Sequence, residues 1–246
     1  MKTIFRSLLL ALLPAALHTG AFAQDNPEPV IICYNGQTAI FPADWLGKPT
    51  RARATAAQKD TFGADSTIIE TAMGKYTRAL LAEELKHVYV TGRLSFNGQY
   101  FSGTNSREDI YIAGSGNDEI EKTFHHEFSS ILLRNHSDMQ LEIKWRELSP
   151  GLRNGNSASA VQAGLYRTDF DTSLCAKGYL SPYSLSNWEN DFNMYAENIF
   201  AGGKRFWELT ERYPLVKQKM QLVVDFYHKL WPGYTVFFFR TAAENQ

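Results

Sequence analysis

The chain has almost no excess charge of either sign. Lys and Arg total 25 and Asp and Glu total 26 among its 246 residues, so the formal net charge is −1. Proteins that bind nucleic acid or an anionic membrane through their electrostatic field carry a basic surplus. The composition therefore excludes both as electrostatic partners and indicates no other.

Long hydrophobic runs are also missing, apart from a short one at the N-terminus. Residues 1–6 are basic, residues 7–17 are apolar, and small residues precede Gln24. This is the pattern of a secretory signal peptide, which we predict to be residues 1–23 with cleavage after Ala23. No later stretch approaches about 20 apolar residues, so no membrane span is expected. We predict a soluble protein in the periplasm or outside the cell.

Cysteine is scarce, since Cys33 and Cys175 are the only two. In an oxidising compartment this pair could close a long loop and stabilise the fold. The alternative, two buried thiols that never meet, is equally compatible with the sequence. No cysteine lies at the predicted cleavage site, which argues against a lipoprotein anchor.

What remains after cleavage, residues 24–246, fits one domain of mixed secondary structure. Apolar runs and alternation predict strands near residues 30–34, 87–90, 93–96 and 109–113, while residues 47–66 suggest loop or short helix. Helical periodicity predicts helices over residues 69–85, from residue 119, over 187–200 and over 215–230. We therefore expect an α+β fold with a small sheet and a helical C-terminal half.

The helix that starts near residue 119 carries the most informative motif. Asn117 or Asp118 is suited to cap it. One apolar stripe on this helix is formed by Ile120, Phe124, Phe128, Ile131 and Leu132. His126 and Ser130 lie one turn apart on a neighbouring face.

His126 and Glu127 begin the motif H-E-x-x-H, in which two imidazoles one helical turn apart bind Zn²⁺ and the glutamate activates a metal-bound water. Ser130 stands where the second histidine should be. A serine hydroxyl is a poor zinc donor. His125 points about 100° away and His136 lies about 15 Å along the axis, so neither replaces Ser130 in an unbroken helix. For His125 we expect a core role with a hydrogen bond to the backbone.

The order of several segments resembles the gluzincin zinc-binding metallopeptidases of Bacteroidetes-type bacteria, which are related in plan to the lethal-factor protease domain. The resemblance covers roughly residues 75–227. It is carried by Gly103-Thr104, Ile110-Tyr111-Ile112, Phe124-His125-His126-Glu127-Phe128, Gly178-Tyr179-Leu180-Ser181-Pro182-Tyr183 and Trp188-Glu189-Asn190-Asp191-Phe192. It implies a zincin-like fold.

The resemblance also implies roles for individual residues. His126 matches the first zinc ligand, Glu127 the general base, and Tyr183 the tyrosine that stabilises the oxyanion. The third ligand of such families is a glutamate at the start of the later helix.

Asn190 occupies that glutamate position when the Asp-Phe pair is aligned. A register slip offers Glu189 or Asp191 as the metal ligand instead, and Glu197 is a weaker candidate.

Two functions follow as expectations. The first is an exported zinc metallopeptidase that hydrolyses peptide bonds and uses His126, Glu127, Tyr183 and an acidic residue at 189 or 191. The second is a pseudoenzyme that keeps the cleft as a peptide- or protein-binding surface, which Ser130 and Asn190 favour. The convergence of enough zinc ligands at His126 discriminates between them.

Overall fold

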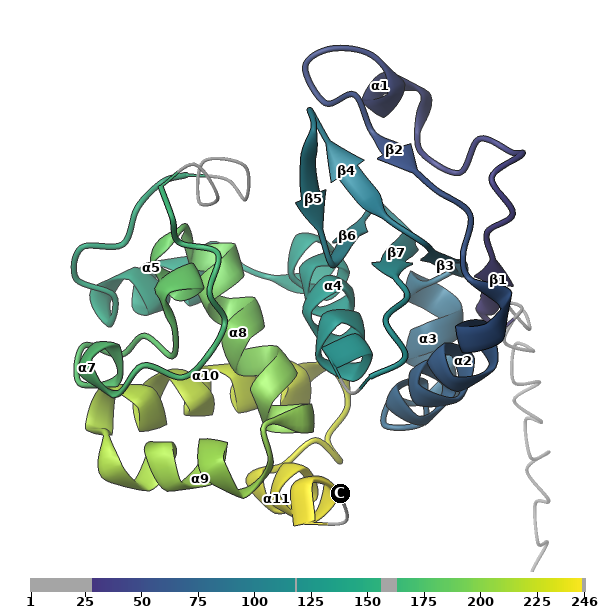
Figure 1. The fold of residues 1–246 in the computed structure, drawn as a ribbon. Helices are drawn as coiled ribbons and strands as arrows, with labels where there is room; N and C mark the ends of the chain where they lie inside the picture. The colour runs from purple at the N-terminus through teal and green to yellow at the C-terminus, as the bar shows by residue number, and fades with distance from the viewer. Residues whose placement is uncertain (1–27, 118, 156–162, 245–246) are drawn as a thin grey trace, which may run out of the picture.

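The computed structural model describes residues 28–117, 119–155 and 163–244 (Figure 1). The predicted signal peptide lies outside these residues. A sheet-containing N-terminal half and a helical C-terminal half lie on either side of one long helix, α4 (Glu119–His136).

The main sheet has four strands in the order β1-β3-β7-β6. The first three are parallel, and the last pairs antiparallel with β7 and forms an edge. Their bounds are Val30–Cys33 (β1), His87–Thr91 (β3), Asp109–Ala113 (β7) and Gly103–Asn105 (β6). Val88 pairs with Ile110, and both side chains are fully buried, as central parallel strands require. The predicted strands are confirmed.

A smaller antiparallel sheet stands beside the edge strand, in the order β2-β4-β5. It consists of Arg53–Ala54 (β2), Leu94–Phe96 (β4) and Gln99–Phe101 (β5). Asn97 and Gly98 form the predicted turn, both with positive φ (48° and 81°). The short helix α1 (Ala43–Leu46) covers this sheet, and Trp45 packs edge-to-face on Phe96.

Two helices replace the single helix predicted over residues 69–85. They are α2 (Lys59–Met73) and α3 (Arg78–Glu84), so the end of the segment 47–66, which was predicted to be loop or short helix, belongs to α2. Gly74 ends the first helix, and the Thr77 hydroxyl caps the second by accepting a hydrogen bond from the Leu80 N–H (3.3 Å). The apolar period continues across this break because the apolar residues of both helices are buried in the same hydrophobic core.

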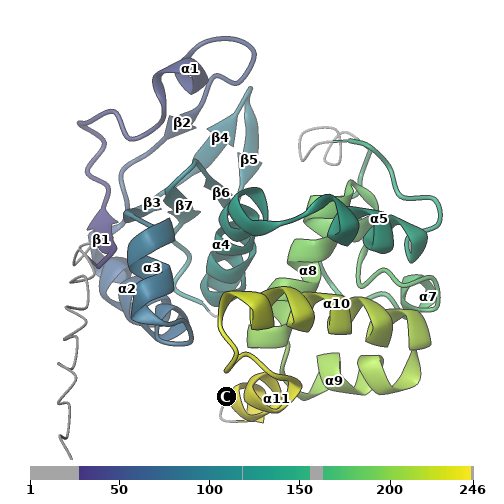
Figure 2. The same ribbon diagram turned by 180° about the vertical axis from the view of Figure 1, so that it is seen from behind.

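The central helix α4 buries the predicted apolar stripe completely. Asn117 caps it by accepting a hydrogen bond from the Glu119 N–H (3.1 Å), whereas Asp118 lies outside the described residues. Figures 1 and 2 show α4 between the sheet and the helical half, so its residues can face both.

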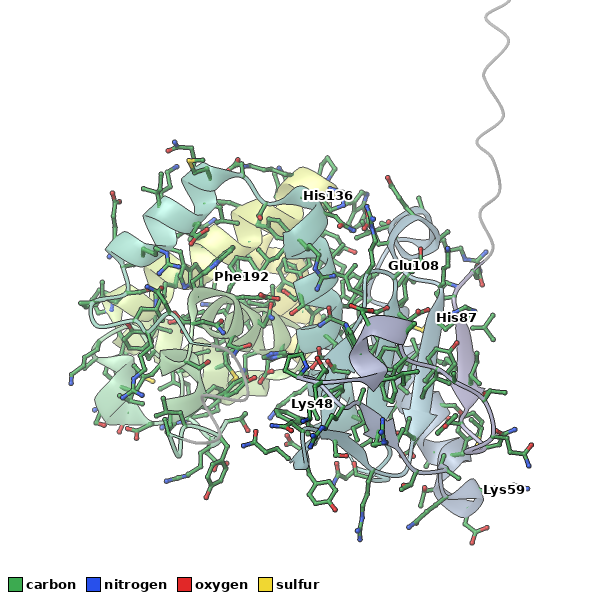
Figure 3. The ribbon with its side chains drawn as sticks, turned by 90° about the horizontal axis from the view of Figure 1, so that it is seen from above. Lys48, Lys59, His87, Glu108, His136 and Phe192 are labelled. Atoms are coloured by element: carbon green, nitrogen blue, oxygen red, sulfur yellow. The ribbon has the colours of Figure 1, made fainter. Side chains whose placement is uncertain are left out.

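The helical half follows α4. Its elements are α5 (Met139–Glu147), α7 (Thr172–Cys175), the 3-10 helix η1 (Pro182–Leu185), α8 (Trp188–Ala201), α9 (Gly203–Arg212), α10 (Pro214–Leu230) and α11 (Val236–Glu244). Phe192 lies inside this half, opposite His87 and Glu108 of the sheet half (Figure 3). Within the described ranges no helix has the length and apolar character to cross a membrane.

Both cysteines are free thiols, so the alternative of two separate thiols describes this structure. Cys33 is half-buried, and Cys175 is fully buried in the helical half. Burial raises the pKa of the Cys175 thiol to about 11.

Candidate functional site

Helices α4 and α8 pack side by side and are joined by two consecutive pairs of polar side chains. His126 Nδ1 lies 2.9 Å from Glu197 Oε2, and the Asn193 amide Nδ2 donates to the Ser130 hydroxyl at 2.7 Å. The two residues on each helix are four apart, which is one turn. Because the number rises on α4 while it falls on α8, the helices run antiparallel through the site.

The start of α8 is fixed by side-chain hydrogen bonds. Asn187 caps it, since its Oδ1 accepts from the Asn190 N–H at 2.7 Å. The Asn190 Nδ2 then donates to the Ser186 hydroxyl at 2.8 Å. These bonds hold the first turn of α8, with Glu189, against the site.

Glu127 is held from the other side by the edge strand β6. The Asn105 Nδ2 donates to Glu127 Oε2 at 2.7 Å. Gly103 allows this approach, because a Cβ there would lie 2.5 Å from Thr123 Cγ2 and 3.0 Å from Glu127 Oε1. A methyl group at position 103 would therefore force the side chains of Thr123 and Glu127 to move.

Two neighbouring cavities open at this junction. The Glu197 cavity, of about 350 Å³, is lined by Tyr100, Phe101, Ser102, Gly103, Glu119, Lys122, Thr123, His126, Glu127, Tyr166, Thr168, Tyr183 and Glu197. The Glu189 cavity, of about 320 Å³, is lined by Thr50, Phe96, Phe101, Gly103, Thr104, Asn105, His126, Glu127, Ser130, Tyr183, Asn187, Glu189 and Asn190. Together we call them the cleft.

The charges in the cleft are coupled. Burial disfavours the charged form of His126, but the hydrogen bond and charge of Glu197, with smaller contributions from Glu127 and Glu189, outweigh it and raise the pKa of the ring. Burial raises the pKa of Glu127, although His126 and the Asn105 bond oppose the shift. The cleft thus holds three interacting carboxylates around one imidazole.

The structure brings most of the predicted site residues together. His126, Glu127 and Tyr183 line both cavities, and the Tyr183 ring centroid lies 5.9 Å from that of His126. Glu189 lines the second cavity. Glu197, the weaker candidate in the sequence, is the carboxylate that contacts His126.

Asp191, predicted as a metal ligand, has a different role and does not line either cavity. Its side chain is fully buried, and its Oδ2 lies 2.6 Å from the Lys219 ammonium group. The Trp145 indole N–H also donates to this oxygen at 2.9 Å. Asp191 follows Asn190 on α8, but it points into the helical core, where it is neutralised by a lysine.

The two other histidines near the motif are structural. His125 is fully buried, and its Nδ1 lies 2.8 Å from the Tyr76 hydroxyl, so its partner is a side chain and not the expected backbone group. Burial lowers the pKa of His125 to about 4, although Glu121 opposes this. His136 pairs with Glu84 at the end of α4 (2.6 Å).

Asn193 is the site residue that the sequence reasoning missed. It is fully buried and occupies the position on α8 that faces Ser130. Its spacing could have revealed it, because Asn193 and Glu197 repeat the four-residue interval of His126 and Ser130 on a helix that packs against α4.

The donor set does not fit a zinc ion. Zinc sites of this type need two imidazoles and a carboxylate. One turn along from the His126–Glu197 pair, the two helices instead carry the neutral hydroxyl of Ser130 and the neutral amide of Asn193, which bond to each other. Throughout the part of the chain that the structure describes, no three His, Cys, Asp or Glu side chains are grouped to hold a metal ion. One feature of zinc sites is present: the Glu197 carboxylate contacts Nδ1 of His126, as carboxylates contact the second ring nitrogen of zinc-binding histidines.

Comparison with solved structures identifies a similar fold. The crystal structure of a "putative zinc-binding metallo-peptidase" from Bacteroides caccae superimposes with a TM-score of 0.57, over 89% of this chain and 84% of that one, at 12% sequence identity. This chain has a zincin-like α+β fold. No protein-family model and no curated protein matches the sequence. The likeness agrees with the fold expected from the sequence and extends to the fold alone.

Proposed function

We propose that this chain is a non-catalytic protein with a zincin-like fold that binds an extended peptide in the cleft. The observation that carries the proposal is the hydrogen bond between Ser130 and Asn193. It satisfies two buried polar groups with each other at the place where a zinc centre needs donors. The cavities above it remain open.

The edge strand β6 supports an extended ligand. Strand β6 pairs antiparallel with β7, and backbone hydrogen bonds join Ser102 and Ser106, the residues that flank β6, to the β7 side. Because every second residue of an antiparallel strand bonds to the neighbouring strand, the backbone groups of Thr104 also face β7. Gly103 and Asn105 then turn their backbone N–H and C=O groups to the open edge. An added peptide strand would pair with these groups and pass its side chains into the cavities.

Zinc-dependent peptide hydrolysis, the other expected function, is favoured by one observation. His126 and Glu127 keep the ligand and base positions of the motif, and Glu197 contacts Nδ1 of the imidazole. Because the remaining donors do not fit zinc, the metallopeptidase activity stays a prediction that metal analysis can test.

Export is part of the proposal. It is supported by the basic, apolar and small-residue segments of residues 1–23. N-terminal sequencing of the protein purified from the periplasm or medium of an expressing bacterium should give a chain that begins at Gln24. Retention of Met1 in cell extracts only would contradict export.

The peptide-binding experiment uses the purified chain and a mixed library of labelled octapeptides, without added metal. The tightest binder is then resynthesised with single N-methylated amides along its length. Strand pairing predicts that methylation of alternate amides weakens binding by about tenfold, whereas the intervening positions, which face away from β6, serve as matched controls. Absence of any binder, or equal effects at all positions, would refute the proposal.

A further inference from the structure

Three side chains that line the Glu189 cavity present hydrogen-bond acceptors without a partner among the described residues. Asn190, whose side chain is more than nine-tenths buried, uses its Nδ2 on Ser186, which leaves its carbonyl Oδ1 without a partner among the described residues. Glu127 accepts the hydrogen bond of Asn105 through Oε2, which leaves Oε1 as an available acceptor. Glu189 has no hydrogen-bond or ion-pair partner in the described ranges.

Basic groups do not balance these oxygens. Neither Lys nor Arg lines the cavity, and its one histidine, His126, engages Glu197 through Nδ1. Arg134 does not line the cavity, and its guanidinium is engaged, because it donates to Asn105 Oδ1 (2.6 Å) and to the Ser106 carbonyl (2.9 Å). The cavity therefore has a surplus of negative charge and acceptors.

Two phenylalanines line the same cavity. Phe96 and Phe101 line the cavity with their ring centroids 5.5 Å apart at an interplanar angle of 66°. A guanidinium group presents five N–H donors at its rim and a flat face that packs on aromatic rings. The carboxylates and the rings that line this cavity match these two features.

We propose that the Glu189 cavity binds the cationic side chain, arginine or lysine, of the peptide held in the cleft. Glu189 and Glu127 would pair with the charge, and the Asn190 carbonyl would accept one of its N–H groups. This inference rests on the proposed peptide-binding function and adds its specificity. A cation with several donors satisfies the acceptors that a neutral side chain would leave unpaired.

The test compares two peptides that differ at one residue, arginine or citrulline, which has nearly the same shape and no charge. Each is built on an octapeptide scaffold that binds the chain, with the residue at the position that faces the cleft. Fluorescence anisotropy at low salt should show about tenfold tighter binding of the arginine peptide, with the difference reduced at high salt. A lysine peptide, like the arginine peptide, should bind more tightly than the citrulline peptide.

Variants locate the effect. Glu189→Gln should reduce the preference for arginine to less than about threefold, because it removes the charge while keeping the size of the side chain. Glu83→Gln, on an exposed residue of α3, makes the same charge change outside the cleft and should keep the full preference.

The outcomes separate the two proposals. Equal binding of the arginine and citrulline peptides would overturn the cationic specificity and leave peptide binding intact. Binding of neither would overturn both. Agmatine, a free guanidinium compound, should bind far more weakly than the peptide; equal affinity would mean a site for free cations and would overturn the peptide-linked proposal.

Discussion

Removing the buried ion pair between Asp191 and Lys219 provides a test of the reassignment of Asp191. Both side chains have 0% exposure, and their charged atoms are 2.6 Å apart. Lys219 also donates to the Gly178 carbonyl (2.8 Å) and lies 4.3 Å from the Tyr179 ring centroid. Burial raises the pKa of Asp191 and lowers that of Lys219, so each partner depends on the other for its charge.

The expected magnitude follows from this burial. Lys219→Met leaves a carboxylate without its cation in the core and should lower the free energy of unfolding by about 3–5 kcal/mol. For a domain of this size that corresponds to a decrease in Tm of about 10 °C. Asp191→Asn leaves a buried lysine and should cost a similar amount.

The double variant Asp191→Asn with Lys219→Met removes both charges and keeps an acceptor for the Trp145 indole. It should be more stable than the sum of the single changes predicts, with a coupling of about 2–3 kcal/mol, measured by urea denaturation of all four proteins. Glu83→Gln is the control for loss of an exposed carboxylate. Additive effects of the two single changes would refute the structural role of Asp191. A loss of stability in Asp191→Asn that occurs only when zinc is present would also refute it.

Three further predictions concern the cleft and its surroundings. The double change Ser130→His with Asn193→Glu supplies the missing imidazole and carboxylate, so the folded variant should retain about one zinc per chain; a folded variant that retains none would contradict the account of the site. The free energy of unfolding should fall by up to about 3 kcal/mol between pH 6.5 and pH 4, because unfolding lets the neutral, buried His125 take up a proton. His125→Gln should remove this slope in denaturation measured across the range, and an unchanged slope would exclude His125 as its origin. Gly103→Ala should displace Glu127 and weaken peptide binding by about tenfold or more, as titration would show, because a methyl group has no room between β6 and α4; unchanged affinity would place the peptide elsewhere.

The elements and the main site helix could be predicted from the sequence because their signals are local. The apolar stripe of α4, the alternation in β3 and β7 and the Asn-Gly turn all depend on neighbouring residues. The break between α2 and α3 was missed, since Gly74 and the Thr77 cap interrupt a hydrophobic pattern that both helices continue.

Part of the site depends on contacts between distant residues. His126 and Glu127 are recognisable from the motif, but Glu197 was ranked below Asp191 and Asn193 was not considered. Only the antiparallel packing of α8 on α4 turns Glu197 towards His126 and Asn193 towards Ser130. Likewise, the buried Lys219 that neutralises Asp191 is 28 positions away in the chain.

If the Ser130–Asn193 pair takes the place of a zinc centre, the purified chain should not retain zinc, and its zinc content can be measured. The protein is exposed to zinc, exchanged extensively into zinc-free buffer and measured by elemental analysis, with His126→Ala treated in parallel. The wild-type protein should hold no more zinc than the variant. About one equivalent per chain that is lost in His126→Ala would contradict this expectation and restore the metallopeptidase.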